Sequence, residues 1–422
     1  MKSVTLSLLQ SAANAFDFGG PVLCDAHHYG EGHINDTFVV WREDHSKRFI
    51  LQRINTDTFT NPVGLMENVC GVTRHLRAKI LAEGGDPARE TLNVIPTLSG
   101  STCYLDADGG AWRAYDFVED TICLQQVGSE ADFRTVAETL GKFQNQLADY
   151  PASTLHETIA RFHDTPNRYA NFEKALAADA LGRAKNITSE IEFIHAREKD
   201  CHVLLDQLAA REIPLRVTHN DTKINNVLID AATGKGICVI DLDTVMPGLS
   251  AYDFGDSIRT GANDCAEDEP DQSKVHFDLH LYEVFAKGYL STAGASMSMA
   301  EKKSLAWGAR LMTLECGIRF LTDYLEGDHY FILLARITTS TAPAPSSHWC
   351  GRWKRFSIRC WKSSARTITD FAISSIRIQQ EAWTLSFSGA SMLLFTAYPY
   401  TPIKSSFEDA GSVEDMMRCS KL

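Results

Sequence analysis

A stretch of alternating apolar and polar segments at residues 217–244 constrains the fold of this chain more than any other feature. Its apolar runs are short, rich in Val and Ile and bounded by polar clusters, which is typical of buried strands. Such strands would deliver Asp221, Asn226 and Asp241 to one place. A carboxylate can accept the proton of an acceptor hydroxyl, and carboxylate and amide oxygens bind Mg²⁺. The stretch therefore predicts a phosphoryl-transfer site, with Asp221 as catalytic base and Asn226 and Asp241 as metal ligands.

Lys223 follows Asp221 closely and is a second catalytic candidate. Its ammonium group would be placed to contact the phosphoryl group during transfer. A solvated lysine is the simpler interpretation of this residue, and a surface hairpin with solvated Asp and Asn side chains is the simpler interpretation of the whole stretch. The ordered set of polar residues between apolar runs favours the catalytic site.

The order His-x-Asp, four residues, Asn, and then Ile-Asp resembles the aminoglycoside-phosphotransferase and choline-kinase superfamily. Longer segments are similar to the N-acetylhexosamine 1-kinase family. These segments are THNDTKINN at residues 218–226, IDLDTVMPG at residues 240–248 and YDFGDSIR at residues 252–259. The similarity extends from about Tyr29 to Tyr330.

The resemblance implies an α+β, protein-kinase-like fold of the aminoglycoside-phosphotransferase type, with two lobes. Residues 1–117 would form a small nucleotide-binding lobe, an antiparallel sheet with one helix, and residues 118–330 a mainly helical lobe for catalysis and sugar binding. The resembled family uses ATP and Mg²⁺ to phosphorylate the anomeric C1 hydroxyl of N-acetylglucosamine and N-acetylgalactosamine. Two alternatives stay open: another small-molecule kinase of the superfamily, acting on choline, homoserine or an aminoglycoside, and a catalytically inactive nucleotide-binding protein.

Nucleotide-binding residues are expected in the small lobe. Gly30 and Gly32 stand ahead of an alternating apolar strand, and glycines let backbone N–H groups approach phosphates closely. An ordinary turn is the alternative for this glycine pair. The next predicted strand, residues 48–54, carries Gln52 and Arg53 where a protein kinase has a phosphate-binding Lys. Arg53 is therefore the candidate cation, although it departs from the pattern of the wider superfamily.

The hinge between the lobes is predicted at residues 115–120. By its position, the backbone of Phe117, Val118 and Glu119 would contact the edge of the adenine ring. This prediction does not depend on the identity of the side chains, because backbone groups make the contacts.

Sugar-binding residues are implied by the resemblance alone. Positions that contact the sugar in the resembled family match His33, Arg319 and Tyr330, in addition to Asp221. Arg319 stands in the segment ECGIRF at residues 315–320. The alternatives are a turn-capping role for His33 and a salt-bridged surface role for Arg319.

The segment Asp-Phe-Gly at residues 253–255 spells the protein-kinase motif whose Asp binds Mg²⁺. The spacing argues against that role for Asp253, because Asp241 lies closer to Asp221 and ends an apolar run. We expect Asp253 instead to cap a helix and to brace the catalytic loop from behind. Asp243 would either hydrogen-bond the metal site or reach the metal itself.

Composition limits the partners and the compartment. A net charge of −13 excludes non-specific nucleic-acid binding, which needs a cationic surface. The sequence shows neither an apolar run long enough to cross a membrane nor the apolar core of a signal peptide. The 11 cysteines are scattered without a CxxC pair, as in reduced proteins. We expect a cytoplasmic monomer whose partners are ATP and an N-acetylhexosamine, with no nucleic acid and no membrane.

Residues 331–422 differ in character from the rest of the chain. They carry 11 Lys and Arg against 6 Asp and Glu, although the whole chain is acidic, and they show no helical or strand period. One interpretation is a reading-frame change near Phe331 that replaced the native C-terminus with unselected, disordered sequence. The other is a genuine extension that binds a partner through its aromatic and basic residues.

Overall fold

The computed structural model of this protein describes residues 4–30, 32, 34–262 and 277–329. His33 and Tyr330, both predicted to contact a sugar, lie outside the described residues, as does the atypical tail at residues 331–422. The predicted lobe boundary near residue 117 stays a prediction. We use the terms small lobe and large lobe for the described residues before and after it.

An antiparallel sheet forms the centre of the small lobe. Its strands run in the order β1-β2-β3-β6-β4, and β5 pairs with β6. They are β1 (Val22–Cys24), β2 (Asp36–Arg42), β3 (Arg48–Ile54), β4 (Val94–Ile95), β5 (Tyr104–Leu105) and β6 (Ala111–Asp116). The register places Thr37 opposite Gln52 and Gln52 opposite Arg113, so these three side chains stand in one row across the sheet. The predicted strands at residues 37–41 and 48–54 are confirmed.

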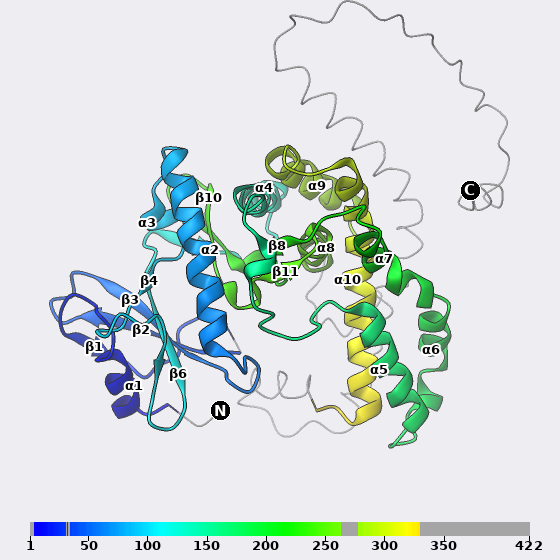
Figure 1. The fold of residues 1–422 in the computed structure, drawn as a ribbon, viewed down its shortest axis with the longest axis horizontal. Coiled ribbons are helices and arrows are strands. Elements are labelled where there is room, and N and C mark those ends of the chain that lie inside the picture. Colours follow the sequence, from blue (N-terminus) through cyan, green and yellow to red (C-terminus); the bar gives the residue numbers. More distant parts are fainter. Residues whose placement is uncertain (1–3, 31, 33, 263–276, 330–422) are drawn as a thin grey trace, which may run out of the picture. The chain divides into compact units, whose positions relative to one another are not determined.

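Helices cover the two faces of this sheet. On one face, α1 (Leu6–Ala13) packs against Phe38, Leu51 and Trp112. On the other, α2 (Pro62–Ala82) packs against Ile54 and also reaches the core of the large lobe. Figure 1 shows α2 between the strands of the small lobe and the helices of the large lobe. The buried side chains of the sheet therefore face either α1 or α2 and the large lobe.

The large lobe is mainly helical, as predicted. Its helices are α4 (Glu130–Gln146), α5 (Thr165–Ala178), α6 (Thr188–His195), α7 (Val203–Ala209), α8 (Ser250–Gly261), α9 (Leu279–Ala293) and α10 (Met299–Glu326). A short helix of the small lobe, α3 (Pro87–Glu90), follows α2. A 3₁₀ turn, Glu198–His202, separates α6 from α7.

Short strands form the apolar parts of residues 217–244 and the chain beside them. They are β7 (Thr121–Cys123), β8 (Arg216–Thr218), β9 (Val227–Asp230), β10 (Gly236–Val239) and β11 (Met246–Gly248). β9 pairs with β7 and β10, and β8 pairs with β11. The strands predicted around the polar clusters are thus present, and the polar residues lie in the turns between them.

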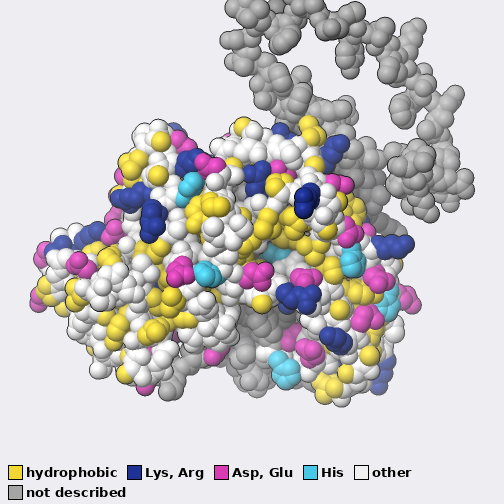
Figure 2. Space-filling view, viewed as in Figure 1, with side chains coloured by type: hydrophobic (Ala, Val, Ile, Leu, Met, Phe, Trp, Pro, Cys, Tyr) yellow, Lys and Arg dark blue, Asp and Glu magenta, His cyan; other side chains and the backbone are white. Residues whose placement is uncertain are grey.

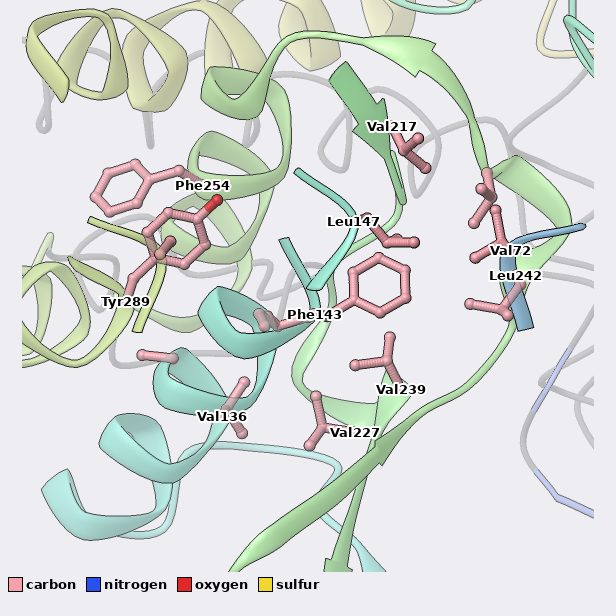
Figure 3. Close-up of a cluster of buried hydrophobic side chains, with 14 of the residues drawn as sticks. Val72, Val136, Phe143, Leu147, Val217, Val227, Val239, Leu242, Phe254 and Tyr289 are labelled. Atoms are coloured by element: carbon pink, nitrogen blue, oxygen red, sulfur yellow. The ribbon is translucent and has the colours of Figure 1, made fainter. Parts of the chain in front are cut away.

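A common hydrophobic core holds these strands against the helices. Val217, Val227 and Val239 point from β8, β9 and β10 toward Phe143 of α4 (Figure 3). All four are buried. Burying a side chain of this size contributes about 1.5–3 kcal/mol relative to exposure. The polar turns are therefore anchored at their bases by apolar strands.

Two glycines bring α8 close to α10. A Cβ atom added at Gly255 would lie 2.2 Å from the carbonyl oxygen of Gly308, and one added at Gly308 would lie 1.9 Å from that of Ala251. No side chain fits at such a distance. The contact fixes α8, which carries Asp253, against the longest helix of the large lobe.

The described residues contain no helix that is both long and apolar enough to cross a membrane. On the face seen in Figure 2, acidic and basic side chains are interspersed over both lobes. The cysteines within the described ranges are all free thiols, as the scattered pattern predicts.

Candidate active site

Asp253 holds the catalytic loop from behind. Its carboxylate accepts the backbone N–H groups of His219 at 2.9 Å and Asn220 at 2.7 Å, and the side-chain amide of Gln144 at 2.6 Å. Burial raises the pKa of Asp253, and these contacts oppose the shift. The predicted brace is confirmed. The predicted helix cap is wrong, because α8 begins after Leu249 and the carboxylate of Asp253 faces the loop instead of the N–H groups of its own helix.

His219 ties the same loop to the end of β10. Its ring is buried, with Nε2 2.8 Å from the carbonyl oxygen of Ile240 and Nδ1 accepting the N–H of Asp221 at 3.3 Å. These contacts fit a neutral ring with the proton on Nε2. Since both nitrogens are used inside the fold, His219 positions Asp221 and is not available as a base.

Asp221, Asn226 and Lys223 are brought together in the turn between β8 and β9. The side-chain nitrogen of Asn226 donates to the carbonyl oxygen of Asp221 at 2.7 Å and lies 3.4 Å from its Oδ2. Nζ of Lys223 lies 3.1 Å from Oδ1 of Asp221. Because the nitrogen of Asn226 is engaged with Asp221, the amide oxygen is the atom left for a cation. Asp221 keeps a partly exposed carboxylate.

Asp241 follows β10 and lies beside this turn. The N–H of Ile240 donates to the carbonyl oxygen of Asn226 at 2.9 Å, which places the two candidate metal ligands on adjacent segments. Asp241 has a positive φ of 59°, a conformation that costs free energy in a residue other than glycine. Burial among protein atoms and the carboxylates of Asp243 and Asp221 raise its pKa to about 7. The side chain still keeps exposed surface, so solvent and ligands can reach it.

The donor set fits Mg²⁺. Asp241 and Asn226 offer hard oxygen atoms. Burial is the main cause of the raised pKa of Asp241, and the carboxylates of Asp243 and Asp221 add to it, so a bound cation would favour the charged form. No group of three or more His, Cys, Asp or Glu side chains within the described residues is arranged to hold a metal ion. A sparse set of one carboxylate and one amide is instead typical of Mg²⁺ held jointly with substrate phosphates.

The small lobe contributes residues that the sequence analysis did not identify. Asp243, in the 3₁₀ turn after Asp241, accepts hydrogen bonds from the guanidinium of Arg113 on one oxygen and from the amide of Asn35 on the other, at 2.6 Å. Burial lowers the pKa of Arg113, but the neighbouring acidic groups, Asp243 first among them, outweigh it and the net shift is upward. One sequence signal could have indicated Arg113. Side chains of β6 alternate between the two faces of the sheet, and Arg113 lies on the same face as Gln52.

Arg53 does not join this group. It neighbours Gln52 on β3, so its side chain points to the other face of the sheet, toward Trp112 and α1. The guanidinium carbon lies 5.9 Å from the centre of the Trp112 ring. Arg113, from the neighbouring strand, is a cation on the same face as Gln52 and pairs with Asp243.

The two predicted loop glycines, Gly30 and Gly32, differ in backbone conformation. Gly30 has a φ of 82°, which disfavours any side chain, whereas Gly32 has no such restriction. Added Cβ atoms at both positions would meet nothing within 4 Å. The N–H of Tyr29 donates to the carbonyl oxygen of Thr37 at 2.8 Å and closes the loop. The space beside both glycines is therefore open to a ligand.

The predicted hinge residues follow β6. Val118 is buried, and the ring of Phe117 is covered by the guanidinium of Arg48 at 3.7 Å. Glu119 forms an ion pair with the same Arg48 at 2.7 Å. These side chains pack the connection between the lobes against Arg48 and the core.

Arg319 lies on α10, one turn after Glu315. The buried carboxylate of Glu315 accepts from Thr165 at 2.6 Å and pairs with Nδ1 of His163 at 2.9 Å. Burial raises the pKa of Glu315, but His163, Thr165 and Arg319 lower it by more. Nε2 of His163 lies 3.4 Å from the carbonyl oxygen of Asn220 in the catalytic loop. Arg319 is thus one helical turn from a polar brace that reaches the residue before Asp221.

Comparison with known proteins agrees with this architecture. The sequence profile described as the phosphotransferase enzyme family matches residues 25–287. Similar solved structures include a microcompartment-associated aminopropanol kinase, with a TM-score of 0.52 and 15% identity over 87% of this chain and 98% of that chain. An aminoglycoside phosphotransferase from Alicyclobacillus acidocaldarius has a TM-score of 0.51 and 12% identity over 89% and 96% of the two chains. A choline kinase from Cryptosporidium parvum has a TM-score of 0.50 and 14% identity over 88% and 97%.

These likenesses confirm the predicted α+β, protein-kinase-like fold of the aminoglycoside-phosphotransferase type. At such identities they show the fold and do not identify an acceptor. The family profile covers well over half of the chain. This protein therefore belongs to the phosphotransferase enzyme family.

Proposed function

We propose that this protein is an ATP-dependent kinase that phosphorylates the anomeric C1 hydroxyl of an N-acetylhexosamine. The observation that carries the kinase activity is the grouping of Asp221, Lys223 and Asn226 in one turn, with Asp241 on the adjacent segment. The acceptor class rests on the sequence similarity of residues 218–226, 240–248 and 252–259 to N-acetylhexosamine 1-kinases.

The catalytic turn supplies the base and a positive charge. Asp221 orients the acceptor hydroxyl and takes its proton as the new oxygen–phosphorus bond forms, while the bond between the γ-phosphorus and its bridging oxygen breaks and ADP leaves. Lys223 moves from the carboxylate of Asp221 toward the transferred phosphoryl group and offsets its charge. The transition state of phosphoryl transfer is loose, so positioning and charge stabilisation account for most of the catalysis.

Metal and nucleotide are held on either side of this turn. Asn226 and Asp241 would hold Mg²⁺, which when bound neutralises charge on the phosphates. The backbone around Gly30 and Gly32 would cover the phosphates, and the backbone of residues 117–119 would contact the adenine. Arg319 would contact the sugar, together with His33 and Tyr330.

The acceptor assay tests this function directly. ATP consumption is measured with N-acetylglucosamine, N-acetylgalactosamine, galactose, choline and homoserine, and the product is identified by the position of its phosphate. We expect turnover with the two N-acetylhexosamines and a phosphate on C1. Turnover restricted to choline or homoserine would assign the protein to another branch of the superfamily, and Mg-ATP binding without turnover would indicate an inactive nucleotide-binding protein.

The raised pKa of Asp241 predicts a pH-dependent response to Mg²⁺. The pKa rises from 3.8 to about 7 on folding, so the group's contribution to stability is fully present below pH 3.8 and is lost as the pH rises through about 7. Mg²⁺ binds the carboxylate and not the acid, so its binding releases this proton below about pH 7. The rise in Tm caused by Mg²⁺ should therefore grow between about pH 6 and pH 8.

Thermal unfolding with and without Mg²⁺ across this pH range measures the effect. Asp241→Asn is the control, because it removes the titrating group and should leave the remaining response to Mg²⁺ independent of pH. An equal Mg²⁺ response of the unsubstituted protein at both ends of the range would contradict the prediction.

A further inference from the structure

We propose that Asp243 is a positioning residue and not a metal ligand. It joins the small lobe to the metal-binding segment through Arg113 and Asn35, so that Asp241 is set in place by residues of the nucleotide-binding lobe. This inference rests on the proposed kinase function and adds the means by which the small lobe governs Mg²⁺ binding.

Both oxygens of Asp243 are used by the small lobe. Arg113 donates to Oδ1, and Nδ2 of Asn35 donates to Oδ2 at 2.6 Å. Asp243 and Arg113 are 3% and 1% exposed, which leaves no solvent-facing oxygen for an ion. Asp241, in contrast, keeps exposed surface. The two carboxylates of this short segment therefore have different roles, one inside the protein and one toward solvent.

The donors to Asp243 are themselves fixed across the sheet. Nε of Arg113 donates to Oε1 of Gln52 at 2.9 Å, and Nε2 of Gln52 donates to Oγ1 of Thr37 at 2.9 Å. Arg113, Gln52 and Thr37 lie opposite one another on the adjacent strands β6, β3 and β2. A protein kinase has a Lys on its third strand, where this chain has neutral Gln52. Here the cation comes from the next strand and pairs with Asp243.

Asn35 brings the glycine loop into the same network. It stands shortly after Gly32, and its Oδ1 accepts the backbone N–H of Asn55 at 2.9 Å. Its amide nitrogen donates to Asp243. The backbone that leaves the phosphate-covering loop is thus connected to the segment that carries Asp241.

The segment between Asp241 and residue 245 is anchored at several points. Oγ1 of Thr244 donates to the carbonyl oxygen of His219 at 2.6 Å, and the amide of Asn68 on α2 donates to the carbonyl oxygen of Val245 at 2.9 Å. With Asp243 held as well, the short turn has little freedom. The left-handed conformation of Asp241 is therefore imposed by its neighbours, and loss of a donor to Asp243 would let it relax.

Calorimetric titration of ADP, with and without Mg²⁺, tests the inference without an acceptor or turnover. Compared with the unsubstituted protein, Arg113→Lys and Asn35→Ala should reduce the Mg²⁺-dependent gain in ADP affinity by about tenfold or more, the usual effect of removing a partner of a metal ligand. ADP affinity without Mg²⁺ should change less than about threefold, because the side chains of Arg113 and Asn35 are both hydrogen-bonded within the protein.

Arg216→Lys is the matched control. Arg216 forms an ion pair with the buried carboxylate of Glu301 at 2.8 Å and also donates to the carbonyl oxygens of Ala148 and Ser296, all within the large lobe. The Arg216→Lys variant should show the same Mg²⁺-dependent gain in ADP affinity as the unsubstituted protein. If Arg113→Lys fails to fold, Asn35→Ala, which keeps the buried ion pair, still decides the question. The double variant Arg113→Met with Asp243→Leu should fold, because an apolar pair can replace a buried ion pair, but should lose the gain.

The outcomes separate the inference from the proposed function. No Mg²⁺-dependent ADP binding by the unsubstituted protein would overturn both. Normal binding by that protein, with an unchanged gain in Arg113→Lys and Asn35→Ala, would overturn the inference alone. The inference would also be overturned if Asp243→Asn lost the gain while Asn35→Ala and Arg113→Lys kept it, because Asp243 would then act as a ligand itself.

Discussion

Asp221→Asn is expected to lower kcat by at least about 10²-fold, the usual size of a general-base effect, with little change in the affinity for ADP. The amide keeps the size of the side chain and leaves the hydrogen bond from Asn226 to the backbone carbonyl oxygen of residue 221 in place, but it cannot accept the proton of the acceptor hydroxyl. It also loses the ion pair with Lys223, whose nitrogen lies 3.1 Å from the carboxylate. Steady-state kinetics with the preferred acceptor, together with calorimetric titration of ADP, measure the two quantities.

Asp206→Asn serves as the control for this substitution. Asp206 lies exposed on α7, and its replacement removes the same charge without touching the catalytic turn. We expect its kcat to stay at the value of the unsubstituted protein. Near-normal turnover of Asp221→Asn would remove the base assignment, and an equal loss in Asp206→Asn would show that net charge alone causes the effect.

Asp241→Ala is expected to abolish Mg²⁺-dependent turnover. It deletes the charged member of the proposed ligand pair and leaves Asn226, a neutral amide that binds Mg²⁺ weakly by itself. The variant should fold at neutral pH, because the substitution removes a carboxylate that Asp243 and Asp221 repel. A loss of activity is then attributable to the site and not to unfolding.

A titration of activity against Mg²⁺, with thermal unfolding recorded on the same samples, checks this expectation. Activity should stay absent at high Mg²⁺ while the Tm remains at or above that of the unsubstituted protein without Mg²⁺. Full recovery of turnover in excess Mg²⁺ would show that Asp241 is not a principal ligand.

The sequence predicted the turn between β8 and β9 because the residues that define it are close together in the chain. Asp221, Lys223 and Asn226 are close in the chain, and the apolar runs around them form the strands that were expected. For Asp253, the predicted brace of the loop was correct and the predicted helix cap was wrong. Spacing along the chain excluded it from the metal site, but whether its carboxylate faces its own helix or the loop depends on how α8 packs against α10.

The small-lobe residues that contact Asp243 were not predicted. Arg53 was chosen because it stands on the strand where kinases place a cation, yet the pleat turns it to the face of α1. Arg113 and Asn35 carry no motif. Their connection to Asp243 spans more than a hundred residues of chain and exists only after the sheet is paired and the lobes meet.

By itself, the sequence indicated a phosphotransferase, the class of fold and the grouping of Asp221, Lys223 and Asn226 in one turn, because these depend on motifs and on periods within a few residues. Only the tertiary structure decided which cation faces the catalytic segments and which carboxylate of residues 241–243 is enclosed. The physical reason is that strand register sets the face of each side chain, and burial of Asp243 requires donors from a distant part of the chain.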